Sequence, residues 1–182
     1  MKQKNKRSRK NTSGFTLVEL TVAMFVLTVG VLGGMIMIIL GMTRDNTNRM
    51  DTTATNAAQA VLEAISAVPA NTDQILQVTD CANVTSFVTT AGATGNGQGA
   101  SLNPNGNGDI DFTQAAVANY QINYTVCNTN GQRTAYDVRW HVTTLPTGAK
   151  LVIVAAGHPT SYNRSHAMAY IAPVSLRTIV GM

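Results

Sequence analysis

Charged residues, aromatic residues and cysteines are all scarce in this sequence of 182 residues. Only 12% of its residues are charged and 5% are aromatic, and its two cysteines are Cys81 and Cys127. Two cysteines cannot build a disulfide-rich scaffold, and neither has a Cys or His neighbour at the spacing of a zinc site. We therefore expect no metal site there. The two cysteines form one disulfide in an oxidising compartment, or else are unrelated buried thiols.

Positive charge is scarce after the first ten residues. The formal net charge is +4, but six of the thirteen basic residues lie within residues 2–10, and the rest of the chain has seven basic and nine acidic side chains. The high pI therefore belongs to the N-terminus. Because phosphate contacts require a basic surface, we expect no specific nucleic-acid partner.

Catalytic motifs are also missing. The three histidines, His141, His158 and His166, are scattered and have no cysteine or glutamate at metal-ligand spacing, so we expect them to be solvated. Ser161 and Ser165 lack a nucleophile-elbow motif, and no phosphate-binding loop is found. The sequence predicts neither an enzyme nor a bound cofactor.

Charge is almost absent from a long N-terminal segment. Between Phe15 and Thr43 the only ionisable side chain is Glu19, and residues 20–42 form a run of 23 uncharged residues. At about 1.5 Å per residue, a helix of this length reaches about 34 Å and can cross the apolar core of a bilayer. Because the basic residues precede it, we expect the N-terminus to stay in the cytoplasm and the rest of the chain to be exported.

Three interpretations of this segment compete. A secretory signal peptide needs a shorter apolar stretch and a cleavage site of small residues, whereas this run is long and contains Gly33 and Gly34. A plain signal anchor explains the length and the flanking charge. It does not explain Glu19, because a carboxylate in a membrane is costly and indicates a specific role.

The third interpretation accounts for Glu19. The residues Gly14-Phe15-Thr16-Leu17-Val18-Glu19 resemble the processing motif of the type IV pilin family, which includes pilus subunits and type II secretion pseudopilins. The resemblance implies that a prepilin peptidase/methyltransferase cuts between Gly14 and Phe15 and methylates the new amine of Phe15. It also implies that Glu19 meets the amine of a neighbouring subunit and sets the register of assembly, because two charges that are each costly in an apolar medium compensate one another.

The apolar run departs from major pilins of that family. Major pilins usually carry a proline near the position of Ile36, whereas the helix predicted here has none and contains glycines at positions 30, 33 and 34. This run is similar to that of minor pilins, above all the minor pilin V group. The resemblance therefore implies a minor pilin of a type IV pilus. The alternatives are a minor pseudopilin of a type II secretion system and a binding or adhesion module at a pilus tip.

A second periodic segment follows the apolar run. Within residues 44–68, apolar residues recur at three- and four-residue spacing, at Ala54, Ala57, Ala58, Val61, Ile65 and Val68. This pattern predicts an amphipathic helix that packs on a domain and ends at Pro69. We divide the chain into a leader (1–14), a transmembrane and assembly helix (15–43), an amphipathic second half of that helix (44–69) and a β-rich globular domain (70–182).

The C-terminal domain is predicted to begin with a loop. Residues 91–109 are rich in Gly and Asn and predict a long surface loop. Oxygen-bearing side chains alternate in its second half, at Asn103, Asn105, Asn107, Asp109 and Asp111. They could face Ca²⁺, but the EF-hand pattern is not met, so a plain loop is the simpler interpretation.

Period-two alternation then predicts strands at residues 120–126 and 136–143, joined by a turn at 128–132. A turn at 145–148, an apolar strand at 151–156 and a last strand at 167–174, placed at an edge by Pro173, complete an antiparallel meander. The predicted fold class is α+β and pilin-like, with a long N-terminal helix packed on a small antiparallel sheet. The implied partners are the prepilin peptidase/methyltransferase, other pilins or pseudopilins, and the bacterial inner membrane. The C-terminal domain is expected in the periplasm and, after assembly, in a pilus or pseudopilus.

Overall fold

The computed structural model describes residues 16–104, 108–128, 131–158 and 172–181. The chain divides into two compact units, Met1–Asp45 and Asn46–Met182, and helix α1 (Leu17–Ser66) contributes to both of them. The predicted cleavage residues Gly14 and Phe15 lie outside the described residues.

The first unit, in its described part, is the apolar half of α1. Its large apolar side chains are all exposed, from 50% at Val31 to 79% at Leu17. The most apolar stretch of α1 has a mean hydropathy of 2.6 and none of it is buried, so by length and composition it can cross a membrane. An apolar surface of this extent is not stable in water.

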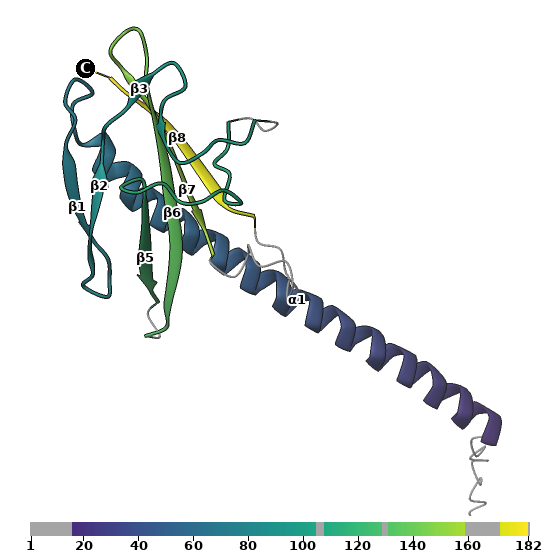
Figure 1. Ribbon diagram of the computed structural model, residues 1–182. Helices are drawn as coiled ribbons and strands as arrows, with labels where there is room; N and C mark the ends of the chain where they lie inside the picture. The colour runs from purple at the N-terminus through teal and green to yellow at the C-terminus, as the bar shows by residue number, and fades with distance from the viewer. Residues whose placement is uncertain (1–15, 105–107, 129–130, 159–171, 182) are drawn as a thin grey trace, which may run out of the picture. The chain divides into compact units, whose positions relative to one another are not determined.

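The second unit contains two β-sheets within the described residues (Figure 1). β1 (Ile75–Thr79) and β2 (Thr85–Thr89) form an antiparallel hairpin. The larger sheet consists of β3 (Ala93–Thr94), β4 (Gln98–Gly99), β5 (Gln121–Cys127), β6 (Arg133–Thr144), β7 (Lys150–Gly157) and β8 (Val174–Val180).

Strand β6 is the centre of the larger sheet. One of its edges pairs along its length with three strands in turn, antiparallel with β5 and β4 and parallel with β3. Its other edge pairs with β7, and β7 pairs with β8, both antiparallel. The predicted meander of β5, β6 and β7 is therefore confirmed, and two short strands extend it.

One face of this sheet is covered by the second half of α1, which runs behind the strands in Figure 1. The predicted apolar stripe is buried in full, at Ala54, Ala57, Ala58, Val61, Ile65 and Val68. Its residues from Ala54 to Ile65 share one core with Val138, Trp140 and Val142 of β6. The α+β fold with the helix packed on the sheet is thus confirmed.

The opposite face of the sheet is covered as well. Ala100, Ile110 and Phe112 pack there against Ile153 and Ala155 of β7. As a result β6 is buried on both faces, and the prediction of a half-buried strand was wrong for its central residues. His141, expected to be solvated, is only 6% exposed.

Residues 91–109 differ from the predicted surface loop. β3 and β4 lie within this segment and pair with β6 beyond the end of β5, and the following Ala100 is 2% exposed. Short strands form here because the free edge of β6 offers unpaired backbone groups. The last strand also differs, since β8 begins at Val174, after Pro173, while 167–171 lie outside the described residues.

Candidate functional site

Thr16 immediately precedes helix α1 and caps its N-terminus. Its carbonyl oxygen accepts a hydrogen bond from the backbone N–H of Leu20 at 3.2 Å, and its Oγ1 accepts one from the N–H of Glu19 at 3.3 Å. Threonine is a preferred N-cap residue, and Thr followed three residues later by Glu is the spacing of a capping box. Glu19 therefore lies in the first turn, where the helix dipole favours a negative charge.

The other polar side chains of the apolar run are satisfied within the helix. The hydroxyl of Thr21 donates to the carbonyl of Val18 at 2.9 Å, and that of Thr28 donates to the carbonyl of Phe25 at 2.8 Å. These bonds let both threonines enter an apolar medium at little cost. The exposed carboxylate of Glu19 is the only ionisable side chain between Thr16 and Thr43.

Glu19 shares a helix face with small residues. At about 100° per residue, Ala23, Gly30, Gly34 and Gly41 fall within roughly 60° of Glu19 on the same side. A methyl group built on any of the three glycines would meet no atom within 4 Å. This face, which we call the glycine face, also carries the larger Val26 and Met37, but its glycines leave positions where the backbone of another helix can approach closely.

The N-terminal residues match a known family. Residues 9–35 match the family model described as the prokaryotic N-terminal methylation motif. The chain carries a prepilin-type N-terminal methylation motif. The matched residues include Gly14, Phe15 and Glu19 and extend through Gly30, Gly33 and Gly34 of the apolar run. No curated protein and no solved structure matches the chain.

The methylation motif supports a function of the pilin or pseudopilin type, in a family that is structural rather than enzymatic. It implies processing by a prepilin peptidase and assembly with other pilins. The apolar half of α1 is consistent with anchoring in a membrane.

The two cysteines are joined in the second unit. Cys81 and Cys127 form a disulfide with their Cα atoms 5.8 Å apart. Cys81 lies in the turn of the β1–β2 hairpin and Cys127 ends β5. The bond therefore fastens this hairpin to the larger sheet.

Asp80, which sequence reasoning did not single out, reinforces the same junction. Its Oδ1 accepts hydrogen bonds from the N–H groups of Ala82 and Val84, both at 2.9 Å, and its Oδ2 accepts one from the N–H of Thr125 at 3.1 Å. Burial raises the pKa of Asp80, but the hydrogen bonds from Val84, Thr125 and Ala82 outweigh it and hold that pKa below its ordinary value.

Lys150 is a second polar residue that the sequence did not single out. It is 5% exposed, and its Nζ donates to the carbonyls of Thr72 and Thr90, each at 3.0 Å, and to Asp73 Oδ1 at 2.6 Å. One sequence feature could have identified it: it is the only lysine after residue 10. It joins β7 to the segments before β1 and after β2.

The alternating Asn and Asp side chains that could face Ca²⁺ are only partly described, because Asn105 and Asn107 lie outside the described residues. Asp109 pairs with Arg177 at 2.8 Å, and Asp111 Oδ1 accepts hydrogen bonds from the N–H and the hydroxyl of Thr113. In the described part of the chain, no group of three or more His, Cys, Asp or Glu residues is placed to hold a metal ion.

Proposed function

We propose that this protein is a minor pilin of a type IV pilus, cut between Gly14 and Phe15 and assembled through α1 into a filament or its tip complex. One observation carries the proposal. An isolated carboxylate, Glu19, lies in the capped first turn of an exposed apolar helix, inside a matched methylation motif. A plain anchor does not need that carboxylate.

The chemistry of the helix start supports processing at Phe15. Cleavage leaves an amine at Phe15, and N-methylation keeps its positive charge. A positive charge at the N-terminal end of a helix opposes the helix dipole, so this amine needs a nearby anion. The Glu19 carboxylate of an adjacent subunit supplies that anion, and both charges leave water together when the helices pack.

The charge pattern and the disulfide support the proposed orientation. Six basic residues precede the apolar run, which favours a cytoplasmic N-terminus and a periplasmic second unit. A Cys81–Cys127 disulfide is stable in an oxidising compartment such as the periplasm. The assignment as a minor rather than a major subunit follows from the glycines at 30, 33 and 34 and the absence of proline from the run.

The mature N-terminus provides the first test. Intact-mass and peptide mass spectrometry should find a chain that begins at Phe15 and carries one additional methyl group. After cleavage, Lys150 is the only lysine left and is buried, so an amine-reactive reagent should label almost only Phe15. A mature chain that begins after Thr43, or a chain that keeps residues 1–14 in assembled filaments, would contradict the proposal.

A substitution of Glu19 provides the second test. Glu19→Ala should still be cleaved but should enter filaments about tenfold less, because the neighbour's amine loses its partner in an apolar environment. The matched control is Glu63→Ala, since Glu63 is the only other glutamate and is exposed. Immunoblots of sheared filaments and of the membrane fraction measure both steps. Normal incorporation of the Glu19→Ala protein would show that the carboxylate has no role in assembly.

A further inference from the structure

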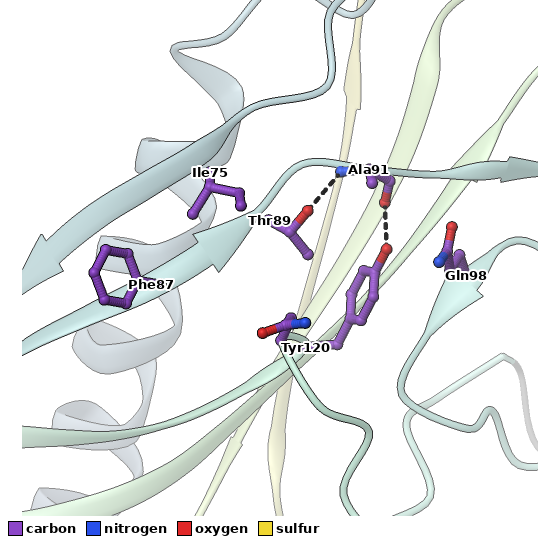
Figure 2. A pocket seen from close by; sticks show the side chains of 7 residues that line it. Ile75, Phe87, Thr89, Ala91, Gln98 and Tyr120 are labelled. Carbon is purple, nitrogen blue, oxygen red and sulfur yellow. Dashed lines mark hydrogen bonds between the residues drawn. The ribbon is translucent and has the colours of Figure 1, made fainter.

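A groove of about 410 Å³ lies in the second unit between β2, β4 and Tyr120 (Figure 2). This volume is within the range of sites that bind small ligands. None of its lining residues belongs to α1, so the groove is separate from the helix that we assign to assembly.

The floor of the groove is fixed by hydrogen bonds. Tyr120 is 4% exposed, and its hydroxyl donates to the carbonyl of Ala91 at 3.0 Å. The Tyr120 ring packs at 6.0 Å from the Trp140 ring, and Trp140 Nε1 donates to the carbonyl of Thr89 at 3.0 Å. The N–H of Ala91 donates to Thr89 Oγ1 at 3.2 Å. The groove is therefore formed before any ligand binds.

One wall of the groove is apolar and open to solvent. Ile75 and Phe87, on the two strands of the hairpin, are 72% and 59% exposed although both are large. Figure 2 shows them on the side of the groove away from Gln98. The disulfide and Asp80 hold this hairpin against the sheet, so the wall has a fixed position.

The groove also has two amide side chains in its lining, Gln98 and Asn119, and the backbone around each is unusual. Gln98 lies between Gly97 and Gly99, whose φ angles are +73° and +123°. A Cβ at Gly97 would lie 2.2 Å from His141 Nε2, and a Cβ at Gly99 would lie 2.4 Å from the Trp140 carbonyl oxygen, so only glycine fits at both positions. Asn119 has a φ of 68°, which is uncommon for a residue other than glycine. Non-glycine residues in such conformations often occur at binding sites.

The chemistry of the lining restricts the ligand. No lining side chain carries a formal charge at neutral pH, so nothing in the groove would compensate a phosphate or a carboxylate. Gln98 and Asn119 are exposed amides, so a ligand that offers hydrogen-bonding groups gains contacts with them that a wholly apolar ligand does not. These features favour a neutral ligand that offers both an apolar face and several hydrogen-bonding groups.

From these features we propose that the groove binds a neutral sugar residue of a glycan. The C–H groups on one face of a sugar ring pack on an aromatic ring such as that of Phe87. Its hydroxyls both donate and accept, as the amides of Gln98 and Asn119 require. An extended peptide carries its polar groups along the backbone and pairs with strand edges. The amide groups that line this groove belong to side chains, and the groove also has an exposed phenyl ring.

The test uses the full chain in a zwitterionic detergent, because many non-ionic detergents carry sugar headgroups that would compete. Saturation-transfer NMR is run with methyl glucoside, methyl galactoside and N-acetylglucosamine, and in parallel with glucuronate and an apolar Leu-rich peptide. We expect at least one neutral sugar to bind, and neither the charged sugar nor the peptide to bind. Phe87→Ala and Gln98→Ala should each weaken binding about tenfold, which corresponds to about 1.4 kcal/mol.

Matched substitutions outside the groove serve as controls. Gln132→Ala removes an exposed glutamine before β6, and Ile179→Ala removes an exposed apolar side chain from β8, and neither should change binding. Phe87→Leu should weaken binding as Phe87→Ala does, because it keeps apolar area but loses the ring. All five variants alter exposed residues, and equal thermal midpoints verify that they fold.

Three results would overturn the proposal. They are a lack of binding by every neutral sugar, binding that survives both Phe87→Ala and Gln98→Ala, and preferential binding of glucuronate or of the peptide. The Glu19→Ala protein separates this proposal from the assembly function, because it should bind the sugar as well as the unaltered chain does. Loss of assembly without loss of binding would therefore leave the glycan site intact.

Discussion

At the scale of single residues, Asp80 has the largest number of described hydrogen bonds to backbone N–H groups. Asp80→Ala leaves the N–H groups of Ala82, Val84 and Thr125 without their acceptor, and we expect the free energy of unfolding to fall by about 2–3 kcal/mol. Asp109→Ala is the control, because its exposed ion pair with Arg177 contributes less than about 1 kcal/mol. Urea unfolding followed by circular dichroism measures both. Equal losses would show that Asp80 is no more important than a surface charge.

The depressed pKa of Asp80 also makes stability depend on pH. Because the pKa is lower in the folded than in the unfolded state, Asp80 contributes its stabilisation above its unfolded pKa of about 3.9. That contribution is lost as the pH falls through the folded pKa. The difference in urea midpoint between the unaltered protein and Asp80→Asn should therefore be full at neutral pH and shrink as the pH falls below the unfolded pKa of about 3.9. A difference that does not change with pH would contradict this assignment.

Buried polar residues show where sequence reasoning stops at this scale. His141 lies on the alternating face that was expected to be solvated, yet its ring nitrogens contact the carbonyl oxygens of Ala100 and Asn96 at 2.8 and 2.9 Å. Arg139 lies over the ring of Phe112 at 4.9 Å. Their partners come from a segment 25 or more residues earlier in the chain. The alternation of polar and apolar residues along one strand shows which residues are polar. It does not show which distant segment of the chain covers them.

At the scale of elements, periodicity predicted the central strands and the helix stripe, since both have long regular patterns. It did not predict the β1–β2 hairpin. Ile75–Thr79 and Thr85–Thr89 are short, and each has only one buried residue, so alternation is weak. The turn between them contains Asn83 with a φ of 62°, and this residue type was the available sign of a hairpin.

The short strands β3 and β4 depend on glycines that differ in their surroundings, and this allows a matched prediction. Gly97→Ala should lower the free energy of unfolding by more than about 2 kcal/mol, because its φ is +73° and the new Cβ would lie 2.2 Å from His141 Nε2. Gly95→Ala has nearly the same φ, +76°, but meets no atom within 4 Å. It should cost only about 1 kcal/mol.

Thermal and urea unfolding of the two glycine variants measure this difference directly. Hydrogen exchange should also show faster exchange at Ala100, whose N–H donates to the Trp140 carbonyl at 2.9 Å, in Gly97→Ala alone. Equal effects of the two substitutions would mean that backbone conformation, and not contact with His141, determines the need for glycine.

At the scale of the whole molecule, the sequence determines two different surfaces. The first unit exposes apolar side chains along its described length, whereas the second unit buries its apolar residues around β6. Composition predicted this division because membrane and water demand opposite surfaces. The groove was beyond sequence reasoning, since its lining comes from β1, β2, β4 and the segment before β5, and only the fold brings these together.

The last prediction concerns the glycine face and the assembly of the protein into filaments. Gly34→Leu adds a bulky side chain to the face that carries Glu19, so it should prevent close helix approach and reduce incorporation into filaments about tenfold. It should not affect cleavage between Gly14 and Phe15 or insertion into the membrane. Leucine is apolar and favours helix, so the apolar helix and its flanking charges stay as they are.

Thr28→Leu is the matched control, because Thr28 lies on the side of α1 about 180° from Glu19 and its side chain is equally free to grow. It should be processed, inserted and assembled normally. Filament yield relative to processed membrane protein is the quantity to compare. If both variants lose assembly, a larger side chain is not tolerated on either side of the helix, and the glycine face has no special role in packing. If neither does, subunits contact one another through another surface, and Glu19 must act without close approach of the glycine face.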